Sequence, residues 1–472
     1  MRLSNLKLQD SSLQFIIFCL ILTTAKAIWL FFNGIPLYAD EAQYWLWSKS
    51  LDFGYYSKPP VIAFLIKTST SIFGDTEAGA RFLSPIFHCA TAFSIFSLAK
   101  NLYSAQTARI AALTYVTLPA IFFSSMLIST DVPLMLIWTL ALDQFYKALQ
   151  HNHIKNWLML GLLFGLGMLT KYHFAIFGIA GLIFIYQTKK TSDVLSSYKP
   201  YIAGLIALSV FSPNILWNIN NHFASFSHTA DLASSGDSII NIKSCLQFLG
   251  AQLLILGPFL CVALISILRN HSKLSQQDLF LIIFSITFFI FITLISLASK
   301  AYANWAAPAY VPLIIFICAQ SAVLGMKKIL SYNFVFQIIL GAIFLLYPLF
   351  MNTLGLPDPY NRMRGMDEVA NIVSNLHTDL GDVTVIADDR KIYASIVFYT
   401  NPHIYDLKKW NPTHRLKDHF DLTASTDVVQ PTSIFISAYA TEEYLREFTD
   451  QKVELRFESK DRTKIFVISN KE

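Results

Sequence analysis

Two adjacent carboxylates near the N-terminus could carry acid–base chemistry. Asp40 and Glu41 open an apolar, aromatic segment that is predicted to start a helix. A carboxylate there can take a proton from an attacking group or stabilise positive charge that develops on a sugar. The pair also suits a plain helix start, because Asp is a common N-cap and Glu is favourable in the first turn. Asp40 is therefore a candidate catalytic residue with Glu41 as its support, and helix capping is the alternative.

Lys58 is a candidate for binding the phosphate of a donor. It follows Tyr55 and Tyr56 and precedes Pro59 and Pro60, which fix the backbone and keep it out of a helix. A lysine held rigidly near an acidic pair can receive a phosphate as a point charge. The alternative is a loop lysine that reaches lipid headgroups. Tyr55 and Tyr56 are taken as supporting residues of the same site.

Further polar residues lie at the ends of predicted membrane spans. Arg81 and Lys300 are additional phosphate-binding candidates, with headgroup anchoring as the alternative. The candidate supporting or substrate-binding residues are Asp131, Lys171, Asn218, His222 and Asn304. Residues 214–228 combine amides with aromatic rings, a composition that suits both sugar recognition and an ordinary interfacial loop. The sequence has no strong zinc spacing and no nucleotide-binding glycine loop, so no cofactor is assigned and a divalent cation is left open.

The composition indicates a membrane protein. Of 472 residues, 54% are hydrophobic and 14% charged, against about 25% charged in a typical soluble protein. This excludes an ordinary soluble enzyme, a disordered chain and, with a net charge of only +5, a nucleic-acid binder. Residues 361–472 hold 33 of the 67 charged side chains. We therefore predict a membrane domain at 1–351 and a small soluble domain at 361–472, with all five cysteines as thiols.

Apolar runs and basic residues predict the topology. The runs lie near 13–32, 82–99, 107–124, 132–149, 200–216, 246–268, 279–298, 307–325 and 332–351. The run at 157–187 is interrupted at Lys171 and has basic residues on both flanks, so we predict that it crosses twice. The result is eleven spans, a cytoplasmic N-terminus, a first outer loop at 33–81 and an outer C-terminal domain. The candidate residues then gather on the outer face.

An outer face has no access to cytoplasmic ATP or nucleotide sugars, so a lipid must deliver any activated group. A polyprenyl phosphate carrier would present its phosphate at the membrane surface, where Lys58 can neutralise it. Transport of a lipid or solute is an alternative that these residues leave open, although a transporter should show charges deep within several spans and internal repeats.

Seven motifs follow one another through the membrane domain. They are D-E-A-Q-Y-W at 40–45, Y-Y-S-K-P-P at 55–60, A-R-F at 80–82, S-T-D-V-P-L at 129–134, L-T-K-Y at 169–172, S-P-N-I-L-W-N at 212–218 and A-N-W-A-A-P-A-Y at 303–310. Together they resemble glycosyltransferase family 39, which includes dolichyl-phosphate-mannose protein mannosyltransferases and bacterial aminoarabinose transferases of lipid A.

The resemblance implies roles for several residues. Asp40 matches the catalytic acid of the first outer loop, and Lys58 matches a lysine that contacts the carrier phosphate in the aminoarabinose branch. That branch commonly has an acidic residue before the lysine, where this chain has Ser57. Arg81 and Asp131 match recurrent positions.

The resemblance also implies a fold and a function. The fold is a polytopic GT-C membrane domain with a small periplasmic α/β domain. The function is an inverting transfer of a sugar from undecaprenyl phosphate to lipid A, lipopolysaccharide or another surface glycan, at the periplasmic face of a bacterial inner membrane. The expected partners are a polyprenyl-phosphate-linked sugar, a glycolipid or glycan acceptor and membrane lipids, with no nucleic acid. Protein O-glycosylation of the mannosyltransferase type is the alternative within the same chemistry.

The C-terminal residues have their own secondary-structure pattern. We predict a helix at 366–380, strands at 383–387, 433–437, 453–457 and 464–468, and a helix or strand at 392–398. The charged triplet 388–390 follows the first strand and is interpreted as a solvated turn, with ligand contact as the alternative.

Overall fold

The computed structural model describes residues 2–234, 240–270, 273–351, 353–358, 360–381, 383–400, 402–404 and 406–470, with side chains from residue 12 onward except those of 232–234. The chain forms two compact units. The helical unit comprises Met1–Phe32, Lys58–Ile62 and Arg81–Leu354. The sheet unit comprises Asn33–Ser57, Ala63–Ala80 and Gly355–Glu472. Most of the predicted first outer loop therefore belongs with the C-terminal residues, a grouping that the sequence pattern does not predict.

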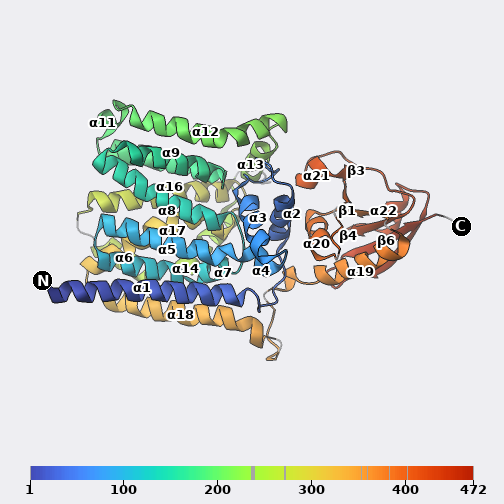
Figure 1. Cartoon of the computed structure of the whole chain (residues 1–472), viewed down its shortest axis with the longest axis horizontal. Helices are drawn as coiled ribbons and strands as arrows, with labels where there is room; N and C mark the ends of the chain where they lie inside the picture. Colours follow the sequence, from blue (N-terminus) through green and yellow to red (C-terminus); the bar gives the residue numbers. More distant parts are fainter. Residues whose placement is uncertain are drawn as a thin grey trace. The chain divides into compact units, whose positions relative to one another are not determined.

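Long, roughly parallel and antiparallel helices build the helical unit (Figure 1). They are α1 (Arg2–Trp29), α5 (Leu83–Leu102), α6 (Ala105–Thr117), α7 (Pro119–Ser124), α8 (Asp131–His151), α9 (Ile154–Met168), η1 (Tyr172–Phe174), α10 (Ala175–Gln187), α11 (Thr191–Leu195), α12 (Lys199–Asn220), α13 (Ala224–Ser234), α14 (Ile242–Leu256), α15 (Pro258–Asn270), α16 (Gln276–Ala298), η2 (Ala303–Ala306), α17 (Ala307–Val323) and α18 (Lys327–Phe350). Aromatic side chains fill the core: Trp138 is fully buried and meets Phe177 and Phe288 edge to face, with ring centroids 5.1 and 5.2 Å apart.

Six helical segments of the described chain are long and apolar enough to cross a membrane. They are Ser12–Trp29, Glu77–Leu102, Lys199–Asn220, Gln276–Ala298, Ala303–Val323 and Lys327–Phe350. A bent pair of helices adds a seventh candidate, and shorter apolar helices include Ile154–Met168 and Tyr172–Gln187. The chain is thus a multi-pass membrane protein by length and composition, and the count of eleven spans stays a prediction.

Three predicted runs contain helix breaks. The run at 107–124 divides at Leu118, between α6 and α7. The run at 157–187 divides near Lys171 into the short helices α9 and α10, as its interruption predicts, and its double crossing of the membrane stays a prediction. The run at 246–268 is not one continuous helix, because α14 and α15 meet at an angle of 100°. Gly257 has a φ of 78° and Pro258 follows it. A left-handed glycine ends α14 and a proline starts α15, which explains the bend.

Close backbone packing joins α9 to α12. A Cβ atom added at Gly161 would lie 2.4 Å from the carbonyl oxygen of Ala203, and one at Gly165 would lie 2.6 Å from the Cβ of Val210. Both glycines lie on one face of α9, four residues apart, and such small-residue spacing lets two helices approach closely in a membrane. The packing fixes α9, whose C-terminal end leads to Lys171.

A six-stranded sheet with covering helices forms most of the sheet unit. Its elements are α2 (Ala39–Lys49), most of α3 (Val61–Phe73), most of α4 (Glu77–Arg81), η3 (Asn361–Met363), α19 (Met366–Leu380), β1 (Thr384–Ala387), α20 (Arg390–Tyr399), β2 (Leu407–Trp410), α21 (His419–Thr423), β3 (Ser425–Thr426), β4 (Ser433–Ser437), α22 (Glu442–Arg446), β5 (Lys452–Glu458) and β6 (Lys464–Ser469). The strand order is β3-β2-β1-β4-β6-β5. The first four strands in this order are parallel to one another, with Val385 opposite Leu407 and Ile434. Strand β6 runs antiparallel to both of its neighbours, β4 and β5.

The predicted C-terminal elements agree with the structure, with two additions. The helix at 366–380 and the strands near 383–387, 433–437, 453–457 and 464–468 are confirmed, and the segment near 392–398 is a helix, α20. Strands β2 and β3 were not predicted. Lys408 and Lys409 interrupt the apolar pattern of β2, although Lys409 is buried. Strand β3 has only two residues, too few for a periodic pattern.

Helix α2 packs against helix α20 inside the sheet unit. The rings of Trp45 and Phe398 meet edge to face with centroids 4.8 Å apart, and Trp45 is fully buried. The Trp45 indole N–H donates to Asp75 Oδ1 at 2.8 Å. The backbone N–H of Leu37 donates to the Tyr399 hydroxyl at 2.8 Å. The contacts with Phe398 and Tyr399 join α2 and the residues before it to the C-terminal residues, and the bond to Asp75 joins α2 to the segment after α3.

A half-buried histidine makes a second connection between these segments. His419 Nδ1 accepts the backbone N–H of Tyr56 at 3.4 Å, and its ring packs on Trp47 and Tyr55 with centroids 5.5 and 5.2 Å away. Burial lowers the pKa of His419 to about 4. The neutral ring is the form that the fold accommodates, because only a neutral imidazole can accept a hydrogen bond.

This burial predicts a loss of stability at acidic pH. The pKa of His419 falls from its ordinary value of 6.5 to about 4, so the unfolded chain binds the extra proton between these pH values. Stability contributed by the neutral ring should therefore fall as the pH drops from 6.5 to 4, by up to about 3 kcal/mol. Thermal unfolding of the purified full-length protein should show a weaker pH dependence in His419→Gln than in the wild type. His414→Gln, at a largely exposed histidine of the same unit, is the matched control and should keep the wild-type pH dependence. Equal pH dependence in wild type and His419→Gln would contradict this interpretation.

Candidate active site

An arginine from α20 holds the carboxylate of Asp40. Arg390 Nη1 donates to Asp40 Oδ1 at 2.8 Å and to Gln43 Oε1 at 2.5 Å. The Asp40 side chain is 40% exposed and that of Arg390 43% exposed, so both reach solvent. Partial burial alone would lower the pKa of Arg390, but the charge and the hydrogen bond of Asp40 outweigh it and raise that pKa. Among the described residues, the hydrogen bonds of the Asp40 carboxylate involve Oδ1 and leave Oδ2 open.

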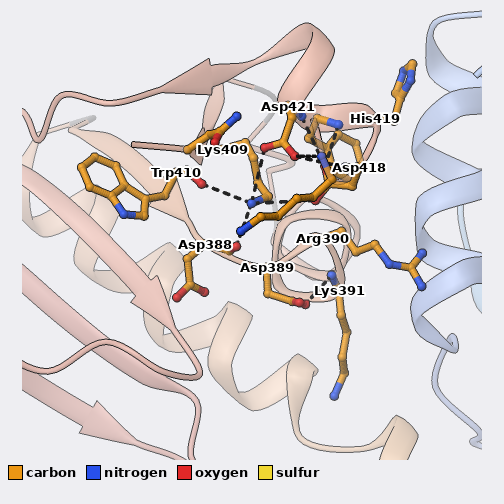
Figure 2. A network of polar contacts seen from close by, with 12 residues as sticks. Asp388, Asp389, Arg390, Lys391, Lys409, Trp410, Asp418, His419 and Asp421 are labelled. Atoms are coloured by element: carbon orange, nitrogen blue, oxygen red, sulfur yellow. Dashed lines mark hydrogen bonds and ion pairs between the residues drawn. The ribbon is translucent and has the colours of Figure 1, made fainter. Parts of the chain in front are cut away.

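The loop after β1 places Arg390 at the start of α20. The backbone carbonyl of Asp388 accepts from Lys409 Nζ at 2.7 Å, which ties the loop to β2. Asp389 Oδ1 accepts the backbone N–H of Lys391 at 2.7 Å and thereby caps α20. Figure 2 shows the Arg390 side chain extending away from the other labelled residues of this network. The triplet 388–390 follows the end of β1, as predicted. Asp388 and Asp389 are held by hydrogen bonds and support Arg390, so the triplet is more than a solvated turn.

Lys409 is the buried centre of that support. Its side chain is 5% exposed, and Nζ lies 3.8 Å from Asp418 Oδ2 and 3.7 Å from Asp421 Oδ1 (Figure 2). It also donates to the carbonyl of Trp410 at 3.2 Å. The two carbonyls accept hydrogen bonds from the buried ammonium, and the two carboxylates balance its charge. The cluster therefore stabilises the edge of the sheet from which α20 begins.

Glu41 has a structural contact in the same region. Its Oε2 accepts the backbone N–H of Tyr38 at 2.9 Å, at the start of α2, and its side chain is 2% exposed. This matches the helix-capping alternative. Asp40, one residue earlier, is the more exposed of the two carboxylates and hence the better placed for chemistry, and the roles of both residues stay predictions.

Tyr55 and Tyr56 are buried supports of the sheet unit. Tyr55 stacks on Trp47 with centroids 4.4 Å apart, and its hydroxyl donates to the Trp47 carbonyl at 3.1 Å. Burial raises the pKa of Tyr55 to about 12. The Tyr56 hydroxyl donates to the carbonyl of Leu416 at 3.0 Å. The two tyrosines fix this segment within the sheet unit, and their supporting role in the site stays a prediction.

Three predicted residues of the helical unit meet in one buried cluster. Lys171 Nζ lies 2.7 Å from Asp131 Oδ1, with 9% of each side chain exposed. Asn304 Nδ2 donates to the other oxygen, Oδ2, at 2.6 Å. Lys171 follows α9, Asp131 opens α8 and Asn304 lies in η2, so the cluster joins three segments far apart in the sequence. The two oxygens of Asp131 are thereby both bonded, which fits a positioning role.

Lys58 lies next to this cluster in the helical unit. The backbone N–H of Val61 donates to the carbonyl of Leu169 at 3.2 Å, so the segment after the two prolines is tied to the segment before Lys171. The charges of Lys58, Lys171 and Asp131 all act on the ring of His173. The structure thus brings Lys58, Lys171, Asp131 and Asn304 together in one region.

Asn218 fixes the junction between α12 and α13. It is fully buried, and its Nδ2 donates to the backbone carbonyl of Asn214 at 3.0 Å and to the Tyr172 hydroxyl at 3.4 Å. Its Oδ1 accepts the backbone N–H of Ser225 at 3.2 Å. These bonds explain Asn218 as a structural residue, and its role in sugar binding stays a prediction.

The remaining candidates differ in exposure. Arg81 ends α4 and is 1% exposed. Lys300 is exposed, with Nζ 5.2 Å from the ring centroid of Tyr302. His222 is exposed in a turn with a positive φ of 54°. Their predicted phosphate- and substrate-binding roles are not settled by these contacts.

Sequence reasoning missed Arg390 and Gln43 as partners of Asp40. Gln43 stands three residues after Asp40 in a helix and therefore on the same face, which is a signal available from the sequence. Arg390 had a weaker signal, because a charged residue after a buried strand is more often solvated. Its pairing with Asp40 joins positions 350 residues apart, which no local pattern can indicate.

Comparison with known proteins identifies the family. A family model described as dolichyl-phosphate-mannose-protein mannosyltransferase matches residues 57–217. The lipid A galacturonosyltransferase RgtD of Rhizobium johnstonii is 32% identical over 396 residues, which are 80% of this chain and 80% of that protein. The undecaprenyl phosphate-alpha-4-amino-4-deoxy-L-arabinose arabinosyl transferase of Yersinia enterocolitica is 28% identical over 174 residues, 35% of this chain and 31% of that protein.

A solved structure confirms the predicted fold class. The crystal structure of ArnT from Cupriavidus metallidurans, bound to undecaprenyl phosphate, superposes with a TM-score of 0.68 at 13% sequence identity and covers 97% of this chain and 98% of that one. This likeness extends over both the helical unit and the sheet unit. Together with the relative that is 32% identical across four-fifths of the chain, it confirms the resemblance found in the motifs. The chain is a multi-pass membrane protein that belongs to the GT-C glycosyltransferases.

Proposed function

We propose that this protein transfers a sugar from undecaprenyl phosphate, or a similar polyprenyl phosphate, to lipid A or lipopolysaccharide at the periplasmic face of a bacterial inner membrane. The observation that carries the proposal is the Asp40 carboxylate, which Arg390 orients through Oδ1 and whose Oδ2 bonds to none of the residues that the structure describes. An oriented carboxylate with a free oxygen is what a general base requires. The name of one relative states transfer to lipid A, and the name of another states an undecaprenyl phosphate-linked sugar, which together support this acceptor and this donor.

The reaction is a single displacement at the anomeric carbon of the donor sugar. An acceptor oxygen forms the new bond to C1 while the bond between C1 and the phosphate oxygen breaks. The bonding electrons leave with the polyprenyl phosphate, and the acceptor proton passes to Asp40 Oδ2. Because the leaving group carries the negative charge, a nearby cation stabilises the transition state.

Lys58 is the residue that we assign to the leaving phosphate. It is half-buried, and the two prolines that follow limit its backbone. Asp131, Lys171 and Asn304 fix the neighbouring segment, so they act as positioning residues of the same region. Arg81 and Lys300 remain further candidates for the phosphate.

Two alternatives remain from the sequence analysis. Transfer to a protein hydroxyl is supported by the match to the protein mannosyltransferase model, although that model covers only residues 57–217. The lipid A relative matches four-fifths of the chain, and we therefore favour a glycolipid acceptor. Membership of the GT-C glycosyltransferases argues against the transporter alternative.

The Asp40→Asn variant tests the proposed base. It keeps the size of the side chain and can still bond to Arg390, but it cannot take a proton at neutral pH. We expect kcat/KM for transfer to fall by roughly 10²- to 10⁴-fold, the usual contribution of a general base. The assay follows a labelled sugar from polyprenyl phosphate to lipid A in detergent. Asp52→Asn, at an exposed residue of the same loop, is the matched control. Wild-type transfer by Asp40→Asn would rule out Asp40 as the base.

The Lys58→Ala variant tests phosphate binding. Removal of a charge-assisted contact to phosphate typically costs about 1.5 to 3 kcal/mol, so we expect kcat/KM for the donor to fall roughly 10- to 100-fold. Lys58→Arg keeps the charge and should recover part of this loss. Lys155→Ala, at an exposed lysine in the first turn of α9, serves as the control. If Lys58→Ala has the same kcat/KM as the wild type, the phosphate must bind elsewhere.

The buried Asp131–Lys171 pair predicts a strong asymmetry between single and double variants. Lys171→Met leaves the Asp131 carboxylate buried without its cation and should destabilise the protein by about 3 to 5 kcal/mol. The double variant Asp131→Leu/Lys171→Met removes both charges and should regain most of that stability. Thermal unfolding in detergent measures the difference. If the double variant is as unstable as Lys171→Met, the unpaired charge of Asp131 is not the cause of the lost stability.

A further inference from the structure

The guanidinium of Arg390 uses only one of its nitrogens within the described parts of the chain. Nη1 carries both bonds, to Asp40 Oδ1 and to Gln43 Oε1. The other edge of the group, formed by Nε and Nη2, bonds to none of the described residues. The side chain is 43% exposed, so this edge can be reached by a ligand. Figure 2 shows the guanidinium held clear of the other labelled charged residues.

The open edge has the geometry of a carboxylate receptor. Nε–H and one N–H of Nη2 are parallel and lie in one plane, and this fork accepts the two oxygens of a carboxylate in a bidentate pair. The bonds through Nη1 to two side chains of α2 fix the rotation of the plane. A fork held in this way loses less entropy when it binds than a free arginine would.

Stability alone does not account for the Asp40–Arg390 pair. Each side chain is about two-fifths exposed, and ion pairs this exposed contribute little, about 0 to 1 kcal/mol. The pair has a further reason if Arg390 serves a bound ligand as well as Asp40.

We propose that the Nε–Nη2 edge of Arg390 binds the carboxylate of the donor sugar, and that the sugar is therefore a uronic acid. This inference rests on the proposed function, because it places the sugar beside Asp40. The name of the relative that is 32% identical over four-fifths of the chain states a galacturonosyl transfer, which agrees with an acidic sugar. Arg390 then connects the base and the sugar through one rigid group, and the C6 carboxylate sets the position of the sugar relative to Asp40.

The test compares two donors that differ only at C6. Polyprenyl phosphate–galacturonate carries a carboxylate there, and polyprenyl phosphate–galactose carries a neutral hydroxymethyl group. We expect the wild type to prefer the galacturonate donor, and Arg390→Gln to reduce the ratio of the two kcat/KM values roughly 10- to 100-fold, the range for a charged hydrogen-bonded contact. Arg390→Lys keeps the charge without the fork and should give an intermediate ratio. Arg446→Gln, at an exposed arginine of the same unit, is the control.

The ratio of the two kcat/KM values distinguishes carboxylate binding by Arg390 from an effect of Arg390 on Asp40. Loss of the bond to Asp40 would slow both donors equally and leave the ratio unchanged, so an unchanged ratio in Arg390→Gln overturns the proposal. A wild type that uses both donors equally overturns it as well. If Arg390→Gln instead raises KM only for phosphorylated lipid A, compared with dephosphorylated lipid A, then Arg390 binds an acceptor phosphate and not the donor. Failure of the proposed function is distinct, because the wild type would then transfer neither sugar, or Asp40→Asn would transfer both normally.

Discussion

The packing of α2 against α20 is the contact on which the candidate site depends. Trp45 and Phe398 bury their rings against each other, and this contact brings Asp40 within hydrogen-bonding distance of Arg390. The apolar contact supplies the binding energy, since the exposed ion pair contributes little by itself. The charged pair supplies orientation. Asp40, the proposed base in the first turn of α2, is thereby held by residues of the same unit that lie more than 300 positions later in the chain.

The helical unit also fixes charged side chains by pairing them, here among apolar helices. Charged side chains among membrane helices must be paired or hydrogen-bonded, because an isolated charge there is costly. Asp131 satisfies this demand with Lys171 on one oxygen and Asn304 on the other. The backbone bond between Val61 and Leu169 then connects Lys58 to the same segment. The ion pair of Asp131 and Lys171 thus fixes the segments next to Lys58, the proposed phosphate-binding lysine.

Much of the fold and several residues of the candidate site could be predicted from the sequence. The features that the sequence did not predict were missed for physical reasons. Hydropathy and charge placement predicted the membrane domain, and the break at Lys171 followed from basic residues on both sides of one apolar run. Ordered motifs led to the GT-C fold and to Asp40 and Lys58. The bend at Gly257 and the burial of Lys409 were missed, because hydropathy does not report backbone angles and a lysine in a strand looks exposed. Arg390 could not be found locally, since its partner is 350 residues away.

The central claim is a single displacement in which Asp40 acts as a base and forms no covalent bond to the sugar. The anomeric configuration of the product tests it most directly. A donor of known configuration at C1 is converted in detergent, and the configuration of the new glycosidic bond is determined by NMR. A single displacement inverts C1, so the product should have the opposite configuration. Retention would contradict the account, because it would require a covalent sugar–enzyme intermediate with a carboxylate as nucleophile.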